Sequence, residues 1–120
     1  MFLIPPEWET FRLVSERAVV ADWKAFPFQE EAFLEWAKRM CDLGNIKECD
    51  FKNLRQKHIV DGYRTHTLES VSKIAQKYDV SYIISDIYYP QLKIIYQNKY
   101  YLYEIQSYIL QFAREKRNKV

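Results

Sequence analysis

Apolar residues follow two alternating patterns along this chain, short continuous runs and longer stretches with three- and four-residue spacing. The first run is Phe2–Ile4, and the Pro-Pro pair that closes it predicts a helix over residues 6–16, because proline is favoured in the first helical turn. Ala18–Ala21 is a second apolar run and predicts a second strand. Phe28–Leu43 has helical spacing and predicts a helix that ends at Gly44, a residue type common just beyond helix ends.

The middle of the chain is less regular. Residues 46–66 mix scattered apolar side chains with many charges, and they predict one or two short helices within a long excursion. After them, Thr67 is placed to cap a helix whose apolar positions continue to about Asp79. Val80–Ile84 follows almost without a loop and predicts a third strand.

The C-terminal third is rich in β-branched and aromatic residues. Leu92–Tyr96 and Tyr100–Ile105, separated by three polar residues, predict a β-hairpin, and Gln106–Lys116 predicts a final helix. Alternation along the second strand of the hairpin divides its side chains between two faces. One face has Tyr101, Tyr103 and Ile105, and the other has Tyr100, Leu102 and Glu104.

This order of elements predicts an α/β fold with a small mixed sheet. The first three strands alternate with helices and are expected to be parallel, and the C-terminal hairpin adds two antiparallel strands. A right-handed first crossover gives the five strands the spatial order 2-1-3-4-5, with helices packed on the sheet. In such a sheet we expect five strand residues to be buried, namely Leu3, Val19, Val20, Ile83 and Ile84.

Length and composition indicate a single domain over residues 1–120. The mean hydropathy of -0.42 excludes an integral membrane protein. The apolar run at the N-terminus is too short for a signal peptide, so the chain as written is expected to be cytoplasmic. The formal net charge of +2 comes from interspersed basic and acidic residues, which argues against a nucleic-acid partner.

No motif for a cofactor or a metal is present, and we expect neither. The two glycines form no phosphate loop, and no serine lies in a nucleophile elbow. His58 and His66 form no ligand set with cysteine or carboxylate, and we expect both to be exposed. A disulfide between Cys41 and Cys49 is conceivable, but nothing in the sequence indicates one, so we expect free thiols.

The polar residues that end the second apolar run form the candidate ligand site. Asp22, Trp23 and Lys24 directly follow Ala18–Ala21, and ligands of open α/β sheets bind beyond the carboxyl ends of parallel strands. Trp23 would stack against a sugar or a base, Lys24 would contact an anionic group, and Asp22 would accept a hydrogen bond from a hydroxyl. The ordinary alternative is a solvated Asp22–Lys24 pair beside a Trp23 that covers the core.

Three further residues belong to this candidate site. Trp36 offers a second flat surface for a sugar or a base, Arg39 would join in contacting anions, and Asp86 is another acceptor for hydroxyl groups. Because Arg39 lies three residues after Trp36 on the predicted helix, its guanidinium is equally placed to pack on the indole in a structural role.

The first half of the chain contains, in order, Ile4-Pro5-Pro6, Ser15-Glu16-Arg17, Asp22-Trp23-Lys24, Pro27, Glu35-Trp36 and Arg39. This arrangement resembles the soluble C-terminal region of a bacterial family of multi-span membrane proteins of unknown function. The later strand and hairpin are similar in pattern to the soluble tails of polytopic glycosyltransferases of the oligosaccharyltransferase kind. The resemblance implies an accessory role with no catalytic residue, because the catalytic acids of those enzymes lie in a membrane region absent here. A detached tail of this kind would be extracytoplasmic.

These observations favour a non-catalytic binding or assembly module. The alternatives are a small enzyme with its site at the ends of strands one to three, and a remnant with a structural role only. If Tyr100–Ile105 is the sheet edge, the tyrosine-rich hairpin would support a weak homodimer or contact a membrane-protein partner. If the last helix instead covers that edge with Tyr108, Ile109 and Phe112, the chain would remain a monomer.

Overall fold

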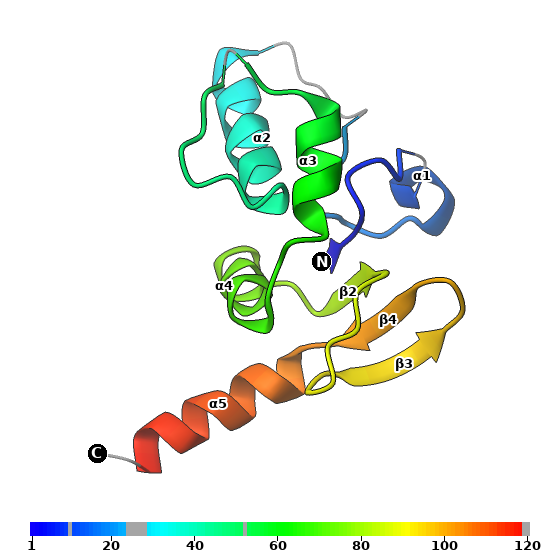
Figure 1. The fold of residues 1–120 in the computed structure, drawn as a ribbon, viewed down its shortest axis with the longest axis vertical. Helices are drawn as coiled ribbons and strands as arrows, with labels where there is room; N and C mark the ends of the chain where they lie inside the picture. Colours follow the sequence, from blue (N-terminus) through cyan, green and yellow to red (C-terminus); the bar gives the residue numbers. More distant parts are fainter. Residues whose placement is uncertain (10, 24–28, 52, 119–120) are drawn as a thin grey trace.

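The computed structural model describes residues 1–9, 11–23, 29–51 and 53–118 (Figure 1). The strands are β1 (Phe2–Leu3), β2 (Tyr82–Ser85), β3 (Lys93–Gln97) and β4 (Tyr101–Glu104). The helices are α1 (Phe11–Ser15), α2 (Glu30–Leu43), α3 (Gln56–Tyr63), α4 (Leu68–Tyr78) and α5 (Gln106–Asn118). In this part of the chain, no helix combines the length and the apolar character needed to cross a bilayer.

The described strands form one four-stranded mixed sheet in the order β1-β2-β4-β3. β1 is parallel to β2, whereas β2 with β4 and β4 with β3 are antiparallel. The predicted fold, with three parallel strands and the order 2-1-3-4-5, is therefore wrong. Its helices and its C-terminal hairpin are present, and the errors concern the second strand and the position of the hairpin.

The predicted second strand, Ala18–Ala21, is reduced to an isolated parallel bridge between Val19 and Phe2. The Phe2 N–H donates to the Ala18 carbonyl at 2.8 Å, and the Phe2 carbonyl accepts from the Val20 N–H at 3.0 Å. Two prolines follow β1 closely and have no N–H to continue a ladder. The segments therefore form no regular strand ladder, and they meet again through the backbone N–H of Trp23 and the Pro6 carbonyl.

The hairpin enters the sheet through its second strand, β4, which leaves β3 at the edge. Tyr103 of β4 pairs with Ile83 on one side and with Ile94 on the other, and it is fully buried. Every residue of β3 is exposed, and Ile95 and Tyr96 are exposed at 49% and 61%. Because β4 has apolar side chains on both faces, an inner position removes more apolar surface from water.

The alternation predicted for β4 is confirmed by the core. Tyr103 and Ile105 belong to the main core with residues of α2, α3 and α4, and Tyr101 packs against it. Leu102 and Tyr100 pack on the opposite side, in a smaller cluster that Phe11 of α1 helps to cover. The five strand residues expected to be buried are all at most 9% exposed, namely Leu3, Val19, Val20, Ile83 and Ile84.

The helices differ in how closely they follow the sequence pattern. α4 begins as predicted, because the Thr67 hydroxyl accepts from the Ser70 N–H and the Ser70 hydroxyl accepts from the Thr67 N–H. The described residues of the excursion over residues 46–66 include one helix, α3, which lies beside α2 (Figure 1). The first predicted helix, over residues 6–16, is limited to the five residues of α1.

Cys41, in the last turn of α2, is joined to Cys49 by a disulfide, with the two Cα atoms 5.8 Å apart. The expectation of two free thiols is therefore wrong. The spacing alone did not indicate the bond, because the chain from Gly44 onward has to reverse direction before Cys49 reaches the helix.

Candidate functional site

Three of the predicted site residues gather at the end of the segment that follows α1. The Trp23 N–H donates to the Pro6 carbonyl at 3.1 Å, which holds this segment beside the end of β1. The Trp36 indole N–H donates to the Asp22 carbonyl at 3.0 Å, and the rings of Trp23 and Trp36 lie 5.3 Å apart. Asp22 and Trp36 are only 1% and 6% exposed, so they face the core. Lys24 lies outside the described residues.

Arg39 comes close to this group but is engaged by neighbouring residues. Its Nε pairs with the Glu35 carboxylate at 2.9 Å, and its Nη1 donates to the Val20 carbonyl at 3.1 Å. Its guanidinium lies over the Tyr78 ring, 5.0 Å from the ring centre. The two roles that the sequence left open for Arg39 were contact with an anion and packing on Trp36. The observed contacts join α2 to residues 18–22 and to α4, so the role of Arg39 is structural.

Asp86, the remaining predicted site residue, lies next to α3 and is engaged by Arg64. It follows β2 and pairs with Arg64, just beyond α3, with Nε and Oδ2 3.0 Å apart. Both side chains are partly exposed, so the pair contributes little to stability. Among the described residues, no group of three His, Cys, Asp or Glu side chains is placed to hold a metal ion.

Buried tyrosine hydroxyls, which the sequence did not single out, lie beside Asp86. Tyr63 donates to the Ile84 carbonyl at 2.7 Å, and Tyr89 donates to the His66 carbonyl at 3.0 Å. Burial raises the pKa of Tyr63 well above its ordinary value and that of Tyr89 to about 12. At neutral pH these groups are hydrogen-bond donors and poor proton carriers. Tyr63 connects α3 to β2, and Tyr89 connects the loop after β2 to the segment between α3 and α4.

His66 is buried, contrary to the expectation of an exposed histidine. Its Nε2 is 2.8 Å from the Leu43 carbonyl and its Nδ1 is 2.8 Å from the Ser70 hydroxyl. Because a carbonyl only accepts, Nε2 carries the proton and Nδ1 accepts from Ser70. Burial lowers the pKa of His66, against smaller opposing effects of Leu43 and Asp42. The neutral ring thus links the end of α2 to α4.

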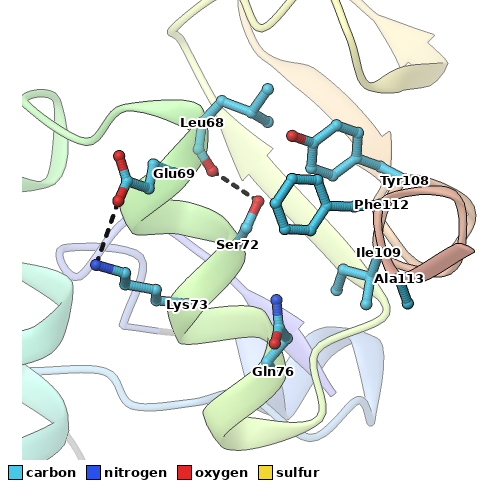
Figure 2. A pocket seen from close by; sticks show the side chains of 9 residues that line it. All are labelled: Leu68, Glu69, Ser72, Lys73, Gln76, Tyr108, Ile109, Phe112 and Ala113. Atoms are coloured by element: carbon cyan, nitrogen blue, oxygen red, sulfur yellow. Dashed lines mark hydrogen bonds and ion pairs between the residues drawn. The ribbon is translucent and has the colours of Figure 1, made fainter. Parts of the chain in front are cut away.

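The structure also shows a surface feature without a counterpart in the sequence analysis, a groove of about 690 Å³ between α4 and α5. Figure 2 shows Tyr108 and Ile109 of α5 directed toward the α4 wall, where the Ser72 hydroxyl donates to the Leu68 carbonyl at 2.7 Å. Along the rim, Glu69 and Lys73 form an exposed ion pair at 3.4 Å. The helical spacing of Tyr108, Ile109 and Phe112 is the sequence signal for this apolar face of α5, and it also fits the alternative in which the last helix covers a strand edge.

A second apolar surface lies along β3. Ile94, Ile95 and Tyr96 are all exposed there, and Tyr88 in the preceding loop is 58% exposed. The β3–β4 register shifts between Ile94 and Tyr96, so β3 carries a bulge at Ile95. Exposed apolar side chains thus gather at the β3 edge as well as in the α4–α5 groove.

Comparison with known protein families gives a match to the N-terminal third of the chain. Residues 1–43 match the sequence model of a family described as Domain of unknown function (DUF6798). The match ends with α2 and covers neither the groove nor β3. No curated protein and no solved structure matches the chain.

Proposed function

We propose that this chain is a non-catalytic binding or assembly module whose α4–α5 groove takes an amphipathic helix of a partner protein. The observation that carries the proposal is the groove itself. Two helices form its walls, its floor has apolar side chains of α5, and its rim has charges of both signs at Glu69 and Lys73. Helix-in-groove recognition needs these features, because the apolar face of the partner enters and its polar flanks meet the rim.

The dimensions of the groove support a helix as its occupant. The α4 wall extends from Leu68 to Gln76, which corresponds to roughly 12 Å of helix and two turns of a partner lying alongside. Small side chains, Ser72 and Ala113, occur on the two walls and leave room for the larger side chains of a partner. A flat sugar or base would instead need the tryptophans, and Trp36 is turned into the core.

The β3 edge is the weaker candidate for this partner. The bulge at Ile95 interrupts the regular spacing that an added strand needs, and Lys93 places a charge at the start of the strand. Both features are ways in which proteins discourage strand addition at an edge. The groove has neither obstacle.

The absence of catalysis in this proposal rests on how the inward-facing polar groups are used. Tyr63, Tyr89 and His66 bond to backbone carbonyls or to Ser70, and each bond joins two elements of the fold. The alternative, a small enzyme, would show turnover of ester, phosphoester or glycoside substrates. We expect background rates, and turnover that is lost in Asp22→Asn or Asp86→Asn would overturn the module.

We further propose that the partner belongs to a multi-span membrane protein related to glycosyltransferases of the oligosaccharyltransferase kind. This step is supported by two resemblances. The order of motifs through Asp22-Trp23-Lys24 and Arg39 resembles multi-span membrane proteins of unknown function, and the later strand and hairpin are similar in pattern to the tails of those glycosyltransferases. The domain would then act as an accessory part of a larger assembly.

The groove is tested with a fluorescein-labelled amphipathic helical peptide that has leucines along one face. Fluorescence anisotropy should show binding that is weakened at least tenfold by Ile109→Glu, because the substitution places a charge on the apolar floor. The matched control is Leu110→Glu, since Leu110 is adjacent in sequence and 61% exposed. Equal loss of binding in both variants, or no binding by the unmodified chain, would contradict the groove.

A further inference from the structure

The corner between α2 and α3 has an unusual concentration of special residues. Both cysteines of the chain and both glycines occur within residues 41–62, at the end of α2, in the following loop and in α3. Gly44 and Gly62 let the two helices approach backbone to backbone, since a Cβ on Gly62 would lie only 1.8 Å from the Gly44 carbonyl oxygen. Because the two helices are this close at Gly44 and Gly62, the loop between them has to start and end at closely defined positions.

The disulfide lies where it fixes the direction of this loop. Cys41 is 3% exposed and one turn after Ala37, whose carbonyl lies 3.9 Å from the Cys49 sulfur. The loop is thereby held along the side of α2. The Asn45 side chain donates to the Thr65 hydroxyl at 2.9 Å and continues the same connection toward the far end of α3.

We propose that the Cys41–Cys49 disulfide is a stabilising structural crosslink and that the chain folds in an oxidising compartment. Disulfides persist in secreted and extracytoplasmic proteins and are rare where thiols are kept reduced. The bond forms by exchange with an oxidised protein or small-molecule disulfide. The two thiols lose two protons and two electrons as the S–S bond forms, and the donor disulfide is reduced to two thiols.

The role of the bond follows from the segment that it closes. Residues 45–55 contain no helix or strand among those described, so few backbone hydrogen bonds hold the loop in place. A crosslink between residues 41 and 49 removes conformational freedom from the unfolded chain, and it keeps the loop against α2 in the folded one. Two reduced thiols at these positions would be small apolar side chains that pack without fixing the loop.

The state of the bond is tested by alkylating thiols at the moment of lysis in cells that make the chain naturally. The intact mass of the purified chain then counts the alkyl groups. We expect no alkylation before reduction and two alkyl groups after reduction with dithiothreitol. A chain that carries two alkyl groups without reduction folds where thiols are reduced, and this result would overturn the proposal.

The structural role is tested on the same unmodified chain by thermal unfolding with and without dithiothreitol. We expect reduction to lower Tm by about 10 °C, a shift typical of a short disulfide loop in a domain of this size. The Cys41→Ser, Cys49→Ser double variant should match the reduced chain and should not respond to dithiothreitol. Equal Tm values for the oxidised and reduced chain would contradict a structural crosslink.

Discussion

At the scale of single residues, the buried polar side chains that join elements of the fold could not be recognised from the sequence pattern. The residues next to His66 in the sequence are polar, as they are around exposed histidines, so the local sequence does not indicate that the ring is buried. Its partners lie four and 23 residues away, at Ser70 and Leu43, so the fold has to bring them together before the ring is satisfied. The hydroxyls of Tyr63 and Tyr89 depend in the same way on distant carbonyls.

The burial of His66 predicts a pH dependence of stability. Because burial lowers the pKa of His66 in the folded chain, the unfolded chain binds a proton first as the pH falls. The free energy of unfolding should therefore be highest above the unfolded pKa of about 6.5 and should decrease as the pH falls below it. Urea unfolding at pH 7 and pH 5 measures this difference, and His66→Gln should reduce it. His58→Gln, on the exposed side of α3, is the control and should leave it unchanged.

At the scale of elements, local signals predicted the longer helices well but predicted the first helix and the strand pairing poorly. The cap at Thr67, the helical spacing of α2 and the two strands of the hairpin are all confirmed, because each depends on residues close in sequence. Ala18–Ala21 reads as a strand, but its ladder depends on the two-residue β1 and the prolines after it. Alternation in β4 showed apolar side chains on both faces, and that was the available signal that β4, rather than β3, is the inner strand.

The same limit applies to the candidate site. Asp22, Trp23 and Trp36, which the sequence assigned to one ligand site, lie close together in the structure, and their binding of a ligand stays a prediction. The sequence could not show that Asp22 and Trp36 face inward or that the Arg39 guanidinium lies over Tyr78. Those orientations depend on how α2 packs against α4 and against residues 18–22.

The contact between α2 and α3 predicts a steep cost for a single methyl group. Gly62→Ala should destabilise the chain by about 3 kcal/mol, because its Cβ would overlap the Gly44 carbonyl, which is backbone and cannot move aside cheaply. Gly44→Ala is the matched comparison and should cost less, since its Cβ would lie 3.0 Å from the Ile59 Cα. Urea unfolding measures both variants. Equal stability of Gly62→Ala and the unmodified chain would show that the helices are farther apart.

At the scale of the whole molecule, α5 and β3 both lie at the periphery of the fold, but they are covered to different extents. α5 extends away from the sheet beside α4 and forms one wall of the groove (Figure 1). α5 does not cover β3. β3 lies on the side of β4 opposite β2, and all of its residues are exposed. The alternative in which the last helix covers the strand edge therefore does not apply to β3, and association through the edge has to be judged from the edge itself.

The predicted weak homodimer through the hairpin now concerns β3 in place of the strand Tyr100–Ile105. Two copies of β3 can pair antiparallel about Ile95, which sets Lys93 opposite Gln97 of the second copy and Ile94 opposite Tyr96 of the second copy. No like charges then face each other, and exposed apolar side chains meet. The bulge at Ile95 interrupts the ladder, so the association should be weak.

Light scattering across a concentration series measures this association. The mass should rise from 14.6 kDa toward twice that value as the concentration increases. Ile95→Lys should keep the chain monomeric, because it places two like charges opposite each other at the centre of the paired strands. Leu110→Lys is the control for added charge, since Leu110 lies on α5, and it should associate as the unmodified chain does. A monomeric mass of the unmodified chain at every concentration would exclude the homodimer.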